Sequence, residues 1–118
     1  MTIQTILIVD DNETDRFLHE AVIQSVYPEI KVLQAVNGAD ALEILQNAKP
    51  DLILLDINMP HMNGLAFLEA CGREIPPVFM LSSSYQDCDI DSVVSHSAVQ
   101  ECLVKPLTPE MVRNIMKI

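Results

Sequence analysis

The sequence predicts an α/β fold: a doubly wound, five-stranded parallel sheet with five helices on its two faces, in three α/β/α layers. Short apolar runs alternate with longer amphipathic stretches along the chain, which is typical of strands joined by crossover helices. The apolar runs are continuous rather than alternating, as expected of strands that are covered on both faces. With 118 residues, the chain is expected to form one domain over 1–118.

The first half of the chain predicts three strands and two helices. Aliphatic runs predict the strands, apolar residues at three- and four-residue spacing predict the helices, and prolines end both helices. The elements are, in order, a strand at 5–9, a helix over about 13–26, a strand at 30–36, a helix with apolar residues from 41 to 48, and a strand at 52–55. The last run is the most hydrophobic of the chain, so we place it at the centre of the sheet.

The second half predicts two more strands and three helices. The elements are a short helix from Gly64 to about Cys71, a strand at 78–81, a helix at 86–97, a strand at 99–104, and a last helix with Thr108 as its N-cap and Pro109 at its first position. The 86–97 stretch is the weakest helix, because it is rich in Asp and Ser, which are poor helix formers.

The side chains of the first helix are assigned by the same spacing. Its apolar face is predicted to consist of Phe17, Leu18, Ala21, Val22, Ser25 and Val26. The three histidines, His19, His61 and His96, are predicted to be solvated surface residues.

Composition excludes several classes of partner. The formal net charge is −10, so the chain repels phosphate backbones and anionic membrane surfaces, and we expect no direct contact with nucleic acid or membrane. No apolar run approaches the ~20 residues of a membrane span, and no basic stretch precedes an apolar signal segment. Three widely spaced cysteines, Cys71, Cys88 and Cys102, are expected to be free thiols, which fits a cytoplasmic location.

Polar side chains follow four of the five predicted strands. Asp10 and Asp11 come after the first strand, Asp56 after the third, Ser82 after the fourth and Lys105 after the fifth. Because the carboxyl ends of parallel strands form one edge of a sheet, where ligands of doubly wound folds bind, we expect these groups to converge.

This set of side chains suits phosphoryl transfer. Three neighbouring carboxylates repel one another unless a cation joins them, and hard oxygen ligands suit Mg²⁺. The cation and Lys105 would neutralise phosphoryl oxygens, and Ser82 could donate a hydrogen bond to one of them. Asp56 would then be a carboxylate nucleophile that forms an acyl phosphate.

Four segments, 6–12, 50–64, 78–83 and 104–106, carry these residues in an order and spacing that resemble the receiver domains of response regulators in two-component signalling, of the stand-alone, chemotaxis-regulator-like kind. The similarity covers the whole chain. It implies the flavodoxin-like strand order 2-1-3-4-5.

The resemblance also implies a ligand set for the metal. Asp10 and Asp11 match the acidic pair that holds Mg²⁺ (or Mn²⁺), directly or through water. Asp56 matches the phosphoacceptor that also binds the metal, and the backbone carbonyl of Asn58 matches the remaining protein ligand. No organic cofactor is implied.

Three further positions have implied roles. Ser82 matches the switch hydroxyl that moves toward the phosphoryl group, and Lys105 matches the lysine that contacts this group. Pro106 matches a position that usually follows a cis peptide bond. The partners implied are a sensor histidine kinase or a histidine phosphotransfer protein as donor, and a downstream protein target.

The sequence departs from the family pattern before the fifth strand's end. The family often has Tyr or Phe three residues before the lysine, a ring that swings inward on activation, and Cys102 occupies this position. Ala98 and Val99 replace the common Gly-Ala pair, which is a lesser change. The output signal is therefore expected to use another side chain or a backbone shift in the 83–97 region.

Three functions are compatible with the motifs. The first is a signalling switch that accepts a phosphoryl group on Asp56 and catalyses only its own phosphorylation and dephosphorylation. The second is an aspartyl-phosphate-type phosphatase, but such enzymes typically carry an acid two residues after the nucleophile, where this chain has Asn58. The third is a degenerate receiver that binds partners without phosphorylation, against which the intact acidic, Ser82 and Lys105 set argues.

Overall fold

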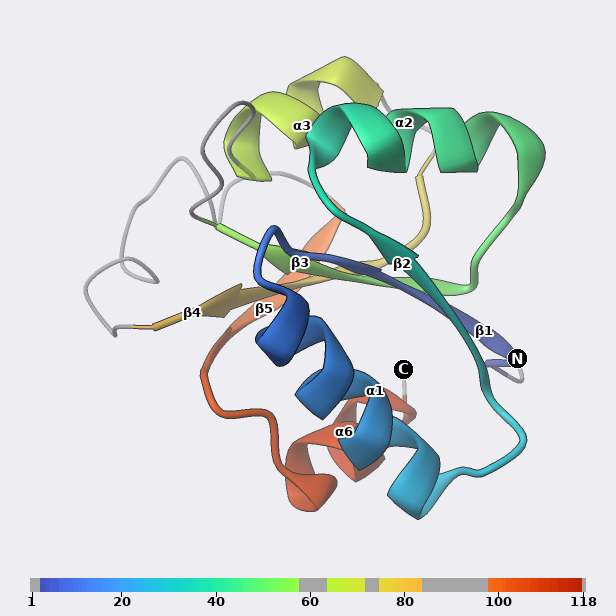
Figure 1. Cartoon of the computed structure of the whole chain (residues 1–118), viewed down its shortest axis with the longest axis vertical. Helices are drawn as coiled ribbons and strands as arrows, with labels where there is room; N and C mark the ends of the chain where they lie inside the picture. Colours follow the sequence, from blue (N-terminus) through green and yellow to red (C-terminus); the bar gives the residue numbers. More distant parts are fainter. Residues whose placement is uncertain (1–2, 58–63, 72–74, 84–97, 118) are drawn as a thin grey trace.

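The computed structural model describes residues 3–57, 64–71, 75–83 and 98–117. Its described strands form one parallel five-stranded sheet in the order β2-β1-β3-β4-β5 (Figure 1). The elements are β1 (Thr5–Val9), α1 (Glu13–Val26), β2 (Lys31–Ala35), α2 (Gly38–Asn47), β3 (Leu52–Asp56), α3 (Gly64–Cys71), β4 (Val78–Ser82), β5 (Val99–Val104) and α6 (Pro109–Ile115). The predicted fold class, strand order and described elements are confirmed. The helix predicted at 86–97 lies outside the described residues.

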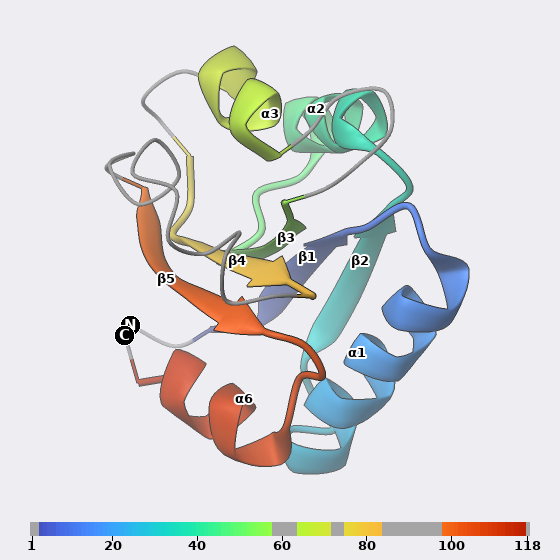
Figure 2. The ribbon, with the colours of Figure 1, turned by 90° about the vertical axis from the view of Figure 1, so that its left-hand side faces the viewer.

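Two layers of helices cover the sheet. Helices α1 and α6 lie together on one face, and α2 and α3 lie together on the other (Figures 1 and 2). Alternation along the strands supplies both faces: Leu7 and Val9 of β1 point to the α2–α3 side, whereas Ile6 and Ile8 point to the α1–α6 side. All five residues of β3 and of β4 are buried, which explains their continuous apolar sequences.

Side-chain caps fix where three helices begin. The Asn12 side chain accepts a hydrogen bond from the backbone N–H of Asp15, and Asn37 does the same for Asp40. The Thr108 hydroxyl accepts from the Met111 N–H, with Pro109 next to it at the start of α6, as the sequence predicts.

The predicted apolar face of α1 is partly wrong. Val22 and Val26 pack against the core, but Phe17 and Leu18 are exposed by 66% and 51%. The buried positions of α1 are His19 and Ile23, which contradicts the prediction that His19 is a surface residue. The buried side is formed by positions 19, 22, 23 and 26, which share one face of the helix. The prediction for His19 is wrong because a histidine can be buried when it lies on such a face.

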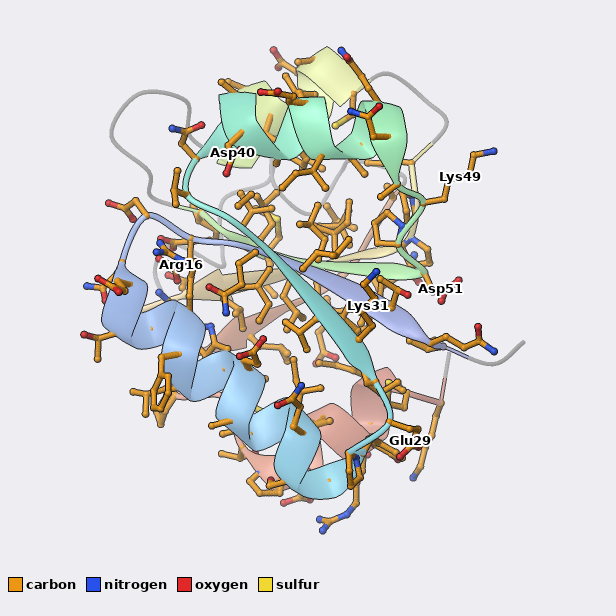
Figure 3. The ribbon with its side chains drawn as sticks, turned by 45° about the vertical axis from the view of Figure 1, so that its right-hand side comes forward. Arg16, Glu29, Lys31, Asp40, Lys49 and Asp51 are labelled. Atoms are coloured by element: carbon orange, nitrogen blue, oxygen red, sulfur yellow. The ribbon has the colours of Figure 1, made fainter. Side chains whose placement is uncertain are left out.

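The amino edge of the sheet is held by a structural acid. One oxygen of Asp51 accepts hydrogen bonds from the backbone N–H groups of Gln4 and Thr5, at 2.8 and 3.0 Å. Figure 3 places Asp51 at this edge, whereas Arg16 of α1 lies toward the opposite, carboxyl edge. None of the described helices has the length and apolar character needed to span a membrane.

Candidate phosphoacceptor and metal site

The sheet register brings the predicted strand ends to one edge. Val9 pairs with Leu55, so the residues that come next, Asp10 and Asp56, lie side by side at the ends of two adjacent strands. Asp56 pairs with Leu81, and Ser82 pairs with Val104, which places Ser82 and Lys105 on the other side of Asp56. The central position of β3 therefore puts Asp56 in the middle of the group.

Three carboxylates form a compact acidic cluster at this edge. Asp10, Asp11 and Asp56 each offer an oxygen, and these oxygens all lie within 4.8 Å of one another. Asp10 and Asp56 are buried, with 1% and 7% of their surface exposed, while Asp11 is exposed. The Asp10 carboxylate also accepts a hydrogen bond from the Asn12 N–H at 2.9 Å. Two buried acids and one open to solvent suit a hard divalent cation that keeps some of its water.

Lys105 supplies the positive charge of the site. Its ammonium lies 3.0 Å from Asp10, 2.9 Å from Asp15 and 3.8 Å from Asp56. Burial by itself lowers the pKa of Lys105, but its hydrogen bonds to Asp15 and Asp10 and the charges of Asp10 and Asp56 outweigh burial, so its pKa lies above the ordinary 10.5. Lys105 is therefore a fixed cation at neutral pH.

Ser82 is fully buried at the end of β4. Its backbone carbonyl accepts a hydrogen bond from the Lys105 N–H at 2.7 Å, which ties the two strand ends together. The peptide bond between Lys105 and Pro106 is cis, as the resemblance implies. Asn58, whose carbonyl is the fourth implied metal ligand, lies outside the described residues.

Two residues that the sequence did not identify complete the surroundings of the site. Asp15, in the first turn of α1, binds Lys105. Arg16 donates from Nη1 to the Asp10 carbonyl at 2.7 Å and from Nε to the Gln34 side chain at 3.2 Å, which joins the β1–α1 connection to β2. An acidic first turn in a helix that starts at the carboxyl edge indicates that Asp15 lies near the site. Its contact with Lys105, however, depends on where the chain leaves β5.

His19 is a buried base near the same charges. Burial and the charge of Lys105 lower its pKa below the ordinary 6.5, against the opposing effect of Asp10 and Asp15. Within the part of the chain that the structure describes, its Nδ1 atom has no hydrogen-bond partner. His19 is therefore neutral at pH 7, and none of the described residues satisfies its Nδ1 atom.

The free-thiol prediction holds for one of the two described cysteines. Cys71 is a free thiol, and burial raises its pKa to about 11. Cys102 is disulfide-bonded, so the prediction of free thiols is wrong for this residue. Both pack against the apolar core. Pairing requires the Cα atoms to approach within about 7 Å, which sequence spacing does not reveal; Cys88 lies outside the described residues.

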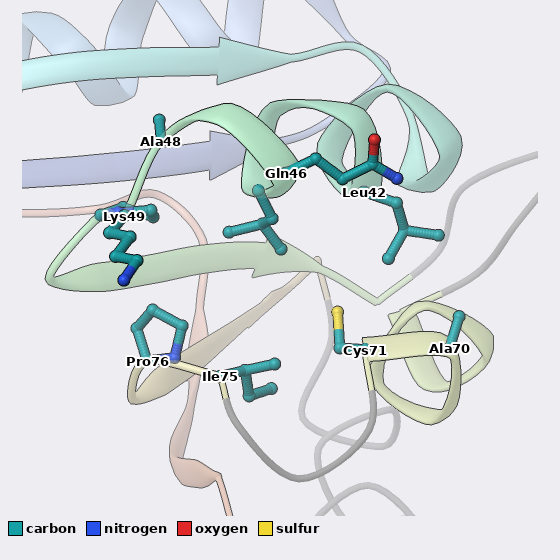
Figure 4. A pocket seen from close by; sticks show the side chains of 10 residues that line it. Leu42, Gln46, Ala48, Lys49, Ala70, Cys71, Ile75 and Pro76 are labelled. Atoms are coloured by element: carbon teal, nitrogen blue, oxygen red, sulfur yellow. The ribbon is translucent and has the colours of Figure 1, made fainter.

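A cavity of about 640 Å³ lies elsewhere, at the amino ends of β3 and β4 between α2 and α3 (Figure 4). Apolar side chains such as Leu42, Cys71 and Ile75 lie around it, and Lys49 lies at one end. None of its described lining residues carries a carboxylate. The acidic cluster therefore lies at the carboxyl edge and is separate from this cavity.

Comparison with known proteins identifies the family. Residues 6–117 match the model of the response regulator receiver domain. The chain belongs to this family. Receiver domains of two-component systems take a phosphoryl group from histidine kinases, bind Mg²⁺ at an acidic pocket and signal to effector partners, and the acidic cluster of this receiver domain could hold a metal.

Relatives agree with this assignment. Over 104 residues, 86% of the chain, this receiver domain is 39% identical to a protein-glutamate methylesterase/protein-glutamine glutaminase of Agrobacterium fabrum, of which it spans 29%. Its structure resembles chemotaxis response regulator CheY4 of Vibrio cholerae, with a TM-score of 0.82, 28% identity and 98% of both chains covered. It also resembles TrrA of Thermotoga maritima in complex with Mg²⁺-BeF, with a TM-score of 0.83, 25% identity, and 98% and 97% covered.

Proposed function

We propose that this receiver domain accepts a phosphoryl group on Asp56, with Mg²⁺ or Mn²⁺ bound by Asp10, Asp11 and Asp56, and signals to a protein partner through a conformational change. The observation that carries the proposal is the convergence of three carboxylates within 4.8 Å beside the Lys105 ammonium. The backbone carbonyl of Asn58 is the proposed fourth protein ligand.

Asp56 is the proposed nucleophile. One of its carboxylate oxygens attacks the phosphorus of the donor, a new O–P bond forms, and the donor's P–N or P–O bond breaks with its electron pair leaving on the donor. The metal, when bound, supplies charge neutralisation for the phosphoryl oxygens. Since Asp56 is 7% exposed, the attacking oxygen is held in place and little solvated before the reaction.

Lys105 and Ser82 bind the transferred group in this proposal. Lys105, 3.8 Å from an Asp56 oxygen, is near enough to pair with a phosphoryl group attached there. Ser82, at the end of the neighbouring strand, donates a hydrogen bond from its hydroxyl to a phosphoryl oxygen. Ser82 ends β4 and Lys105 directly follows β5, and the hydrogen bond from the Lys105 N–H to the Ser82 carbonyl joins these two strand ends. We therefore expect a shift of one residue to displace the other.

The proposed donor is a sensor histidine kinase or a histidine phosphotransfer protein, and the proposed receiver of the signal is a downstream protein. Phe17 and Leu18 support a protein partner, because these large apolar side chains are exposed on α1, the helix that follows Asp10 and Asp11. The proposed activity is confined to the chain's own phosphorylation and dephosphorylation.

The test is incubation with acetyl phosphate or phosphoramidate, with Mg²⁺ and with EDTA, followed by intact-mass spectrometry. We expect one added phosphoryl group in Mg²⁺ and none in EDTA or in Asp56→Asn. Glu13→Gln, which removes an exposed acid of the first turn of α1, is the matched control and should label like the wild type. Multiple turnovers on a small phosphoester would instead favour a phosphatase, and no labelling by any donor would favour a degenerate receiver.

A further inference from the structure

Lys105 is bound more closely by the acids beside the acceptor than by the acceptor itself. Its Nζ lies 2.9 Å from Asp15 and 3.0 Å from Asp10, with hydrogen bonds to both, but 3.8 Å from the nearest Asp56 oxygen. One N–H of the ammonium is left to pair with a phosphoryl group on Asp56, but any movement of Lys105 toward that group stretches its contacts with Asp15 and Asp10. The strength of the contacts therefore opposes the interaction of Lys105 with the phosphoryl group.

Asp10 and Asp15 differ in whether a bound cation competes with Lys105 for their carboxylates. The Asp10 carboxylate is a member of the acidic cluster, so a bound cation competes with Lys105 for it. Asp15 is not part of this cluster, so a cation bound there does not compete with Lys105 for its carboxylate. Asp15 is then the competitor that remains for Lys105 at the moment of phosphorylation.

The structure of α1 fixes Asp15 in this place. Its N–H is bound by the N-cap side chain of Asn12, so the backbone at Asp15 is held at the beginning of the helix. A carboxylate in the first turn is also favoured by the helix dipole. The side chain is 34% exposed, compared with 2% for Asp10, and removal of Asp15 leaves Lys105 beside the carboxylates of Asp10 and Asp56.

We propose that Asp15 is a positioning residue that restrains Lys105 and thereby weakens the response of the site to a phosphoryl group. The proposal rests on the function proposed above and adds a residue that the family motifs do not contain. A partly exposed ion pair is worth up to about 1 kcal/mol, which corresponds to a change of roughly two- to fivefold in an equilibrium constant. Asp15→Asn should therefore tighten binding of a phosphoryl mimic by roughly two- to fivefold.

The experiment is calorimetric titration of the chain with beryllofluoride in saturating Mg²⁺, for the wild type, Asp15→Asn and Glu13→Gln. Glu13→Gln removes the same charge from the same exposed helix turn, and none of the described contacts of Lys105 involves Glu13. It measures the effect of charge alone. Asp15→Asn should bind beryllofluoride more tightly than both the wild type and Glu13→Gln.

A double-mutant cycle separates restraint of Lys105 from a general effect of structure or charge. In the Lys105→Met background, Asp15→Asn should no longer change the affinity for beryllofluoride. A second readout needs no metal or mimic: the ¹⁵N resonance of the Lys105 side chain should shift in Asp15→Asn and stay unchanged in Glu13→Gln.

Three results would overturn the inference: equal affinities for Asp15→Asn and Glu13→Gln, weaker binding by Asp15→Asn, or an Asp15→Asn effect that persists without Lys105. These results are distinct from failure of the proposed function, because that failure would appear as no beryllofluoride binding and no phosphorylation by the wild type.

Discussion

Replacing Lys105 with methionine should destabilise the chain strongly when divalent cations are absent. The substitution keeps most of the aliphatic side chain but removes an ammonium that lies 3.0, 2.9 and 3.8 Å from three carboxylates. Two of these carboxylates, Asp10 and Asp56, are buried and would remain as like charges with no lysine between them.

The magnitude follows from the distances and the burial. At an effective dielectric constant of about 20, unit charges at about 3–4 Å attract by about 4–6 kcal/mol, from which the cost of desolvating the ions is subtracted. Asp15, which is 34% exposed, contributes at most about 1 kcal/mol. Removing one partner of a buried ion pair typically costs about 3–5 kcal/mol, so we expect Lys105→Met to lose about 3 kcal/mol in EDTA.

Saturating Mg²⁺ should reduce this loss, since the cation neutralises the same carboxylates. A ligand at ten times its Kd stabilises the folded state by about 1.4 kcal/mol, and Lys105→Met should gain more because no ammonium competes for Asp10. Urea unfolding followed by circular dichroism, in EDTA and in Mg²⁺, measures both effects. Lys49→Met, at an exposed position without a described ion pair, is the control. A loss below about 1 kcal/mol in EDTA, or equal losses in both buffers, would refute the reasoning.

Three further changes test the rest of the structure. The pKa of His19 is lowered by burial, so in mildly acidic solution the unfolded chain binds a proton that the folded chain does not. The free energy of unfolding of the wild type should therefore fall as pH drops below about 6.5, by up to about 1.4 kcal/mol per pH unit. In urea titrations at several pH values, His19→Leu should lose this part of the pH dependence. A slope that His19→Leu leaves unchanged would contradict this assignment. Phe67→Ala should cost about 3–5 kcal/mol in urea unfolding, because Phe67 is fully buried against β1 and β3; a cost below about 1 kcal/mol would show that the site is not packed as described. Asp51→Ala should lose about 1–3 kcal/mol, because it removes the acceptor of two backbone hydrogen bonds at the edge opposite Asp56. Labelling by acetyl phosphate should stay normal, and impaired labelling of the folded variant would count against this separation.

The strands and helix starts could be predicted because each depends on local chemistry. The aliphatic run before Asp10 suits a strand covered on both faces, and Asn12 and Thr108 are side chains that cap helices. The convergence of Asp10, Asp11, Asp56, Ser82 and Lys105 was predictable for a related reason. Each group directly follows a strand, and parallel strands bring their carboxyl ends to one edge.

The surroundings of the site could not be predicted in the same way. The contact between Asp15 and Lys105 depends on the rotation of α1 about its axis and on the path of the chain after β5, which are set by packing. The same rotation buries His19 and exposes Phe17, although apolar spacing alone favoured the opposite assignment. Pairing of Cys102 is likewise a property of the folded distances.

The central claim is that Asp56 is the carboxylate that takes the phosphoryl group when a divalent cation joins the acidic cluster. It is tested most directly by treating the chain with acetyl phosphate and Mg²⁺, trapping any acyl phosphate with borohydride, and locating the reduced residue by peptide mass spectrometry. The account predicts Mg²⁺-dependent reduction at position 56. Reduction at another acid, or at Asp56 to the same extent in EDTA, would contradict it.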